Sequence, residues 1–186
     1  MKQLRWIFIL ATMVVLTVGG TSFSADVTTV PYVDLQKYLG HWYEIASIPA
    51  WFQKTCVGGT TASYRLLDDG SISVVNSCLT DSDDVLTSQG RAFVEDTQTN
   101  AKLRVSFVNF KDTWLFPGNY WVLGLGKNYE YAVVGEPTRE YGWVLSRSCT
   151  LSSENLAEVI DILTAQGYDI SQFIVTNQSS FGCTPE

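Results

Sequence analysis

The side chains of this sequence best suited to redox or metal chemistry are its four cysteines, Cys56, Cys78, Cys149 and Cys183. An even number of cysteines in a secreted chain is typical of disulfide bonds, and four cysteines allow three connectivities. The sequence contains neither a CxxC pair nor a cluster of cysteine and histidine, so a structural zinc ion would lack ligands. We therefore expect disulfides and no metal or other cofactor.

The single histidine, His41, limits acid–base and nucleophilic chemistry. It lies inside a Gly40-x-Trp42 motif, where we expect it to be exposed, and a Ser-His-Asp triad needs a histidine near a pocket. The segment GLGKNY, residues 124–129, resembles the start of a phosphate loop. It lacks the later glycine, the Lys-Ser/Thr pair and the following helix of such loops, so the sequence predicts no catalytic residues.

One carboxylate, Glu44, stands out because of its neighbours in the segment WYEIAS. Side chains of a strand point to opposite faces in turn, so Glu44 shares a face with Trp42 and Ala46. A carboxylate on a buried face must be hydrated, paired or protonated. Two interpretations remain open: Glu44 bonds to polar groups of the fold, or it meets the headgroup of a ligand.

The elements that position these residues follow a predicted secretory signal at residues 1–24. Basic residues precede a short apolar run, which ends in the small residues of SFSA. We expect a mature chain that starts at Ala25 or Asp26 and is secreted or periplasmic. The first cysteine is Cys56, so the sequence predicts no lipid-modified cysteine near the cleavage site.

The length of 186 residues fits one mature domain, residues 25–186, with a sizeable core. The formal net charge is −7, which disfavours a nucleic acid as a partner. No basic cluster suggests an anionic membrane surface. The sequence leaves the oligomeric state open.

Alternating runs separated by turn residues make up most of this domain. The Asp-Gly of DDG, residues 68–70, lies between two such runs and predicts a β-hairpin. Further runs, among them AKLRVSFVNF and GNYWVLGLG, bring the number of strand candidates to eight. Short strands at regular spacing indicate an up-and-down barrel or a sandwich.

Near the C-terminus the period changes from two to that of a helix. In SSENLAEVIDILTAQGYD the residues at helical spacing are apolar, a serine stands at the N-cap position, and Gly167 follows the end. The segment SQFIVTN predicts one more short strand. In the same segment Asn177 begins an Asn-Gln-Ser glycosylation pattern, which matters only if the host glycosylates.

From Tyr38 to Cys183 the chain resembles the lipocalin family, in particular the group with apolipoprotein D, the bacterial outer-membrane lipocalin and the temperature-induced lipocalins. Gly40-x-Trp42 with YEIA is similar to the first lipocalin signature, YWVLGLGKNYEYAVV stands in the place of the second, and WVLSR, ending in Arg147, is similar to the third. The usual Thr-Asp-Tyr of the second block is absent. The resemblance implies an all-β, eight-stranded antiparallel up-and-down barrel with one C-terminal helix and a short final strand.

The resemblance also assigns positions within the barrel. It implies that Trp42 fills the closed end, that Arg147 lies across the Trp42 ring, and that Gly40 lets the preceding segment turn. With the strand phase set by Trp42 and Arg147, alternation predicts an apolar lining with a few polar groups. The predicted ligand-binding residues are Glu44, Tyr64, Asn76, Val94, Val105, Phe107, Tyr120, Val122, Trp143 and Leu145. Each of these could equally be a core residue.

The same resemblance implies a disulfide between Cys56 and Cys183, with Cys78–Cys183 as the alternative. Strand directions place Cys56 and Cys78 toward the open mouth and Cys149 at the closed end. A bridge needs α-carbons within about 7 Å, so a bond from Cys149 to Cys56 or Cys78 is disfavoured. This scheme leaves Cys78 and Cys149 unpaired.

Two classes of function remain open. The resemblance implies a carrier or scavenger of a small lipophilic ligand, such as a fatty acid, lysophospholipid or isoprenoid. The alternative is a lipocalin-fold enzyme, an isomerase or a reductant of lipid peroxides that uses a reduced cysteine facing the cavity. A structural stress protein without a ligand would instead have a filled barrel.

Overall fold

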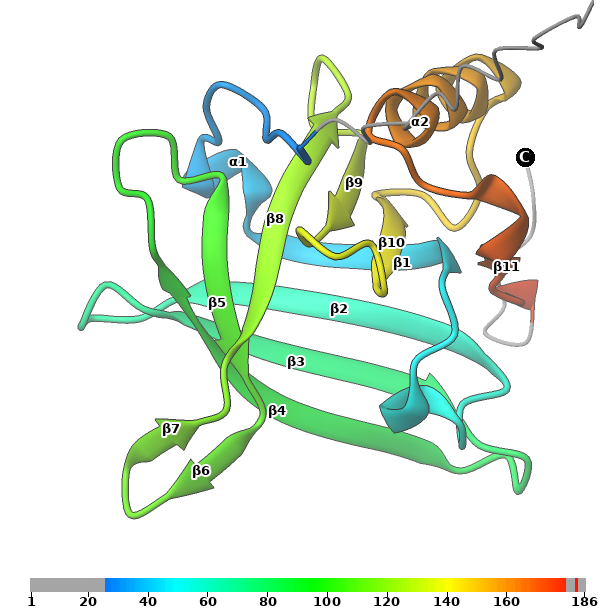
Figure 1. Ribbon diagram of the computed structural model, residues 1–186. Coiled ribbons are helices and arrows are strands. Elements are labelled where there is room, and N and C mark those ends of the chain that lie inside the picture. The colour runs from blue at the N-terminus through cyan, green and yellow to red at the C-terminus, as the bar shows by residue number, and fades with distance from the viewer. Residues whose placement is uncertain (1–25, 180–182, 184–186) are drawn as a thin grey trace, which may run out of the picture.

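The computed structural model describes residues 26–179 and Cys183, and the predicted signal at 1–24 lies outside them. Its nine-stranded sheet has the order β10-β9-β8-β5-β4-β3-β2-β1-β11, and an additional pairing of β10 with β1 closes eight of these strands into a barrel (Figure 1). This confirms the predicted antiparallel up-and-down barrel. The barrel strands are β1 (Gly40–Ser47), β2 (Gly58–Leu66), β3 (Ile72–Leu79), β4 (Val85–Val94), β5 (Lys102–Ser106), β8 (Gly118–Leu125), β9 (Tyr131–Gly135) and β10 (Gly142–Ser146).

The predicted Asp-Gly turn joins β2 to β3. Gly70 has φ +79°, a left-handed conformation that glycine adopts without a steric penalty. The backbone N–H of Leu67 donates to the carbonyl of Ser71 at 2.8 Å and closes the loop. From this turn β2 and β3 pair in antiparallel register as far as Gly58 and Leu79, with one bulge.

The closed end of the barrel is sealed around Trp42, which has no exposed surface. The guanidinium carbon of Arg147 lies 3.6 Å from the centre of the Trp42 ring, and the Trp42 Nε1–H donates to the carbonyl of Tyr38 at 2.8 Å. Gly40, at φ +96°, turns the chain from the short helix α1 (Leu35–Tyr38) into β1. The Arg147 guanidinium donates at 2.6–3.1 Å to the backbone carbonyls of Lys37, Tyr38, Leu39 and His41.

The predicted helix packs on the outside of the barrel as α2 (Ser153–Ala165), coloured orange in Figure 1. Its N-cap is Ser152, whose hydroxyl accepts from the backbone N–H of Asn155 at 3.2 Å. Val159 and Leu163 are buried against residues of β8, β9 and β10. Among the described residues, no helix has the length and apolar character needed to cross a membrane.

The connection between β5 and β8 differs from the prediction of one continuous strand over AKLRVSFVNF. The β5 strand ends at Ser106, and β6 (Val108–Phe110) pairs with β7 (Thr113–Leu115) in a separate hairpin that projects from the barrel (Figure 1). Ser106, which alternation predicts to face solvent, is 1% exposed. The reason is that its hydroxyl donates to the backbone carbonyls of Val108 and Leu115 in this hairpin.

The predicted final strand, β11 (Ile174–Val175), continues the sheet where β1 and β2 separate. It follows the short turn η2 (Ile170–Gln172) and pairs antiparallel with the mouth end of β1. Beyond β11, the carbonyl of Asn177 accepts from the backbone N–H of Gly59 at 2.7 Å. A side chain at Gly58 would start 2.5 Å from that carbonyl, so this close approach requires glycine.

The disulfide prediction Cys56–Cys183 is wrong, as is the expectation that Cys78 and Cys149 are unpaired. The structure pairs Cys56 with Cys78 and Cys149 with Cys183, with α-carbon separations of 5.6 and 6.0 Å. Cys56 immediately precedes the residues that pair with the mouth end of β3, so Cys78 is its neighbour. Because β11 is antiparallel to β1, the tail beyond it runs from the mouth toward the closed end, where Cys149 follows β10.

We expect Trp42→Ala to lower the free energy of unfolding by about 3–5 kcal/mol, because it leaves a cavity at the sealed end. Urea denaturation followed by circular dichroism measures this loss. Trp51→Ala is the matched control: Trp51 is 71% exposed, and its replacement should cost no more than about 0.5 kcal/mol. Equal losses of unfolding free energy in the two variants would contradict the role of Trp42 as the side chain that fills the closed end.

Candidate functional site

Above the sealed end, the barrel encloses a cavity of about 770 Å³ that opens at the mouth. This volume lies within the range of about 300–1,000 Å³ typical of small-molecule sites. Side chains of β1 to β5, β8 and β10 and of the loops at the mouth form its walls. The cavity is therefore large enough for a lipophilic molecule of moderate size.

Eight of the ten predicted ligand-binding residues line this cavity. The structure places the other two, Val94 and Val122, below it. Val122 is fully buried in the cluster around Trp42, and Val94 packs against the apolar cluster of β3, β4 and β5. Alternation gives the face on which a side chain lies but not its depth along the barrel. The eight lining residues are Glu44, Tyr64, Asn76, Val105, Phe107, Tyr120, Trp143 and Leu145.

Sequence reasoning found Trp143 but missed the other three members of a row of aromatic residues on one wall, because it considered strand residues alone. The rings of Trp51, Phe52, Tyr141 and Trp143 follow one another with centroid separations of 5.6, 5.9 and 6.1 Å. Trp51 and Phe52 belong to the short turn η1 (Trp51–Gln53) between β1 and β2. The adjacent aromatic pair in PAWFQ was the available signal. The row leads from the exposed rim into the cavity.

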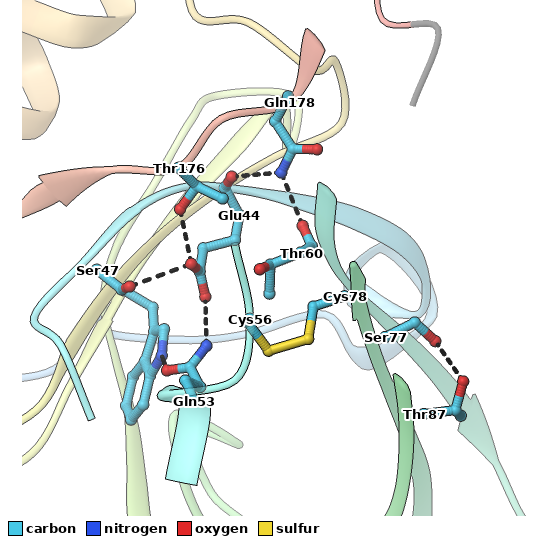
Figure 2. Close-up of a disulfide and its surroundings, with 11 residues drawn as sticks. Glu44, Ser47, Gln53, Cys56, Thr60, Ser77, Cys78, Thr87, Thr176 and Gln178 are labelled. Carbon is cyan, nitrogen blue, oxygen red and sulfur yellow. Dashed lines mark hydrogen bonds between the residues drawn. A yellow bond between two sulfur atoms is a disulfide. The ribbon is translucent and has the colours of Figure 1, made fainter. Parts of the chain in front are cut away.

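Glu44 lies in the cavity wall, where three side-chain donors surround its carboxylate (Figure 2). These donors are the hydroxyl of Ser47 at 3.1 Å, the amide of Gln53 at 3.0 Å and the hydroxyl of Thr176 at 2.7 Å. Glu44 is 6% exposed, so these bonds replace the water that its burial removes. The carboxylate thus joins β1, the η1 turn and the C-terminal segment, in agreement with the structural interpretation of Glu44.

Two further links hold the same part of the mouth together. The side-chain amide of Gln178 donates to the backbone carbonyls of Glu44 and Thr60, at 2.7 and 2.8 Å, and so fixes the C-terminal segment between β1 and β2 (Figure 2). The Cys56–Cys78 disulfide ties the loop after η1 to the end of β3, and both cysteines line the cavity. The upper wall is therefore cross-linked both covalently and by hydrogen bonds.

Tyr64 and Tyr120 lie at the floor of the cavity, and Tyr38 lies directly beneath them; the three side chains are called the tyrosine floor below. The hydroxyl of Tyr120 lies 2.7 Å from that of Tyr38 and 3.0 Å from that of Tyr64. Burial raises the pKa of Tyr64 to about 12, and it raises the pKa values of Tyr38 and Tyr120 well above their ordinary value. All three hydroxyls stay protonated at neutral pH.

The charged side chains in the cavity lining are all acids: Glu44, Glu136 and Glu140. Within the described residues that form this lining, none is a lysine, arginine or histidine. Glu136 is 6% exposed, and its carboxylate accepts from the backbone N–H groups of Thr138, Glu140 and Tyr141. It therefore serves to order the β9–β10 turn.

The remaining candidates for chemistry lie elsewhere. His41 is exposed at the closed end, where its Nδ1 lies 3.1 Å from the hydroxyl of Ser63. Across residues 26–179 and 183, no group of three or more histidine, cysteine or acidic side chains is arranged to hold a metal ion. All four cysteines are in disulfides.

The comparisons of this chain with known proteins all point to one family. A family model described as a lipocalin-like domain matches residues 33–178. The chain is 38% identical to the outer membrane lipoprotein Blc of Escherichia coli K12 (82% of this chain, 83% of Blc) and 34% identical to temperature-induced lipocalin-1 of Arabidopsis thaliana (83% and 84%). It is 35% identical to mouse apolipoprotein D (79% and 78%). Insecticyanin from the tobacco hornworm Manduca sexta has the same fold, with a TM-score of 0.68 and 24% identity over 87% of this chain and 89% of insecticyanin.

Because the Glu44 carboxylate is the common acceptor of three donors, we expect Glu44→Ala to destabilise the protein by about 1–3 kcal/mol. Chemical denaturation measures the change. Glu44→Gln should cost less, since its amide oxygen still accepts hydrogen bonds. Glu95→Ala, at an exposed acid, is the control and should remain within about 0.5 kcal/mol of the parent. A Glu44→Ala protein as stable as this control would contradict the role of Glu44.

Proposed function

The chain belongs to the lipocalin family, whose members generally bind small hydrophobic ligands, and on that premise we propose that its cavity binds a lipid for transport or scavenging. The ligands that we propose are a fatty acid, a lysophospholipid or a lipid of similar size. The observation that carries this proposal is the open cavity of about 770 Å³ with its largely apolar and aromatic walls.

The size of the cavity sets the expected affinity. Burying about eight methylenes of one acyl chain contributes roughly 6 kcal/mol, at ~0.8 kcal/mol for each methylene. Ordering the chain costs part of this, so contacts of the headgroup must offset that cost and supply roughly 2 kcal/mol more. A net free energy near −8 kcal/mol corresponds to a dissociation constant on the order of 1 μM.

The two other functions have less support. A structural protein without a ligand predicts a filled barrel, whereas the barrel of this chain contains an open cavity. The thiol-dependent enzyme predicts a reduced cysteine that faces the cavity. The two cysteines in the cavity wall, Cys56 and Cys78, are bonded to each other, so this alternative has no observation in its favour.

We also propose that the protein is exported. Two disulfides are typical of an oxidising compartment outside the cytosol. N-terminal sequencing of the native protein should find Ala25 or Asp26 as the first residue, in the periplasmic or secreted fraction. Membrane-bound protein that still begins at Met1 would contradict this proposal.

We expect fatty acids or lysolipids to quench tryptophan fluorescence with dissociation constants on the order of 1 μM, because Trp143 lines the cavity. Trp143→Ala should weaken binding more than it lowers the melting temperature, as measured by titration and by calorimetry. Trp114→Ala is the control, since Trp114 lies on β7 away from the cavity. A panel of fatty acids, lysolipids and retinoids that leaves the emission unchanged would contradict lipid binding.

A further inference from the structure

The tyrosine floor has more hydrogen-bonding capacity than its own contacts use. Tyr38 comes from α1, Tyr64 from β2 and Tyr120 from β8, and their hydroxyls meet at 2.7 and 3.0 Å. Three hydroxyls carry three protons, but the cluster contains two hydrogen bonds. One proton is therefore left for a partner outside the cluster.

The surroundings determine where this spare proton lies. Tyr64 and Tyr120 line the large cavity and also a void of about 10 Å³ beneath it, whereas Tyr38 lines only the void, whose remaining walls are aliphatic. A spare donor on Tyr38 would be buried without a partner, which costs about 1–3 kcal/mol. When Tyr38 donates to Tyr120, the spare proton is on Tyr120 or on Tyr64. The cluster thus presents its free donor to the cavity.

The charges around the cavity select the kind of group that this donor binds. The charged lining residues are Glu44, Glu136 and Glu140, and the described lining contains no basic side chain. An ionised carboxylate or phosphate on the floor would be desolvated without a basic side chain of the cavity lining in contact with it. An uncharged oxygen accepts the same hydrogen bond without that penalty.

Building on the proposed function, we propose that the floor is a binding site for an uncharged hydrogen-bond acceptor at the end of a lipid. The acceptor is a ketone, aldehyde, ester or alcohol oxygen, which receives the spare proton of Tyr64 or Tyr120. Such a ligand lies with its polar end at the floor and its apolar part toward the aromatic row at the mouth. An ionised fatty acid places its carboxylate at the mouth instead and gains nothing from the floor.

The test compares four ligands of equal chain length on the parent protein at pH 8: 2-dodecanone, dodecan-1-ol, dodecanoate and 1-dodecene. Displacement of the uncharged fluorescent probe N-phenyl-1-naphthylamine reports their affinities. We expect the ketone and the alcohol to bind roughly five- to tenfold more tightly than the alkene, the gain typical of one hydrogen bond. Dodecanoate should bind more weakly than the ketone.

Variants assign this preference to the floor. The double variant Tyr64→Phe/Tyr120→Phe removes both hydroxyls that face the cavity and should reduce the preference for ketone over alkene about fivefold, whereas either single replacement leaves one free donor and should keep the preference. The matched control is Tyr131→Phe, which removes a buried hydroxyl outside the cavity, one that donates to Glu158 at 2.6 Å. This control should keep the preference of the parent.

Each outcome decides between the two proposals. Equal affinities for ketone, alkene and dodecanoate, or tighter binding of dodecanoate, would overturn the inference about the floor and leave lipid binding intact. A ketone preference that persists in the folded double variant Tyr64→Phe/Tyr120→Phe would also overturn it. If neither the probe nor any of the four ligands binds, lipid binding itself fails. The comparison on the parent protein stands even if a variant does not fold.

Discussion

The contact between Arg147 and Trp42 is the interaction on which the rest of the barrel depends. Arg147 follows β10 and Trp42 lies on β1, and the pairing of these two strands closes the sheet. The guanidinium donates to four backbone carbonyls around the end of α1 and the start of β1, and one of these, that of Tyr38, also accepts from the Trp42 indole. One side chain thereby fixes the closure of the barrel, the indole that fills its end and the helix that covers it. Because the carbonyl of Tyr38 is among those acceptors, the same contact positions Tyr38 for the cavity floor.

The mouth is stabilised in a different way from the closed end. Around Glu44, hydrogen bonds join three segments that the strand ladder leaves apart: the end of β1, the η1 turn and the C-terminal segment. The Cys56–Cys78 bridge adds a covalent tie across the same wall, and closing a loop of this length removes about 3 kcal/mol of chain entropy from the unfolded state. The mouth can therefore keep a wide opening and still hold its loops in place.

The strands and their phase could be predicted because alternation and turn residues are local properties of the sequence. Eight of the ten residues predicted from this phase lie in the cavity wall, whereas Val94 and Val122 lie below the cavity, because period-two alternation carries no information about depth. The three missed members of the aromatic row, Trp51, Phe52 and Tyr141, lie in connections between strands, to which no periodicity applies. The disulfides depended on the direction of the tail after β11, which is a tertiary feature. The projecting β6–β7 hairpin, too, could not be separated from β5 on sequence alone, because the alternation runs through the junction.

Polar groups that serve the fold differ from those that face the cavity in how fully they are paired. The carboxylates of Glu44 and Glu136 and the guanidinium of Arg147 each have several hydrogen-bond partners within the protein, as burial of a charge requires. In contrast, the tyrosine floor has one hydroxyl proton without an acceptor. The side-chain oxygen of Asn76 is also buried without a partner. Asn76 lies on β3 opposite Ala62 of β2, nearer the mouth than Tyr64. Unpaired capacity in a buried site is costly unless something occupies the site. Within the cavity lining, the buried polar groups that have unused hydrogen-bonding capacity are uncharged, which is the arrangement suited to a lipid with a neutral polar group.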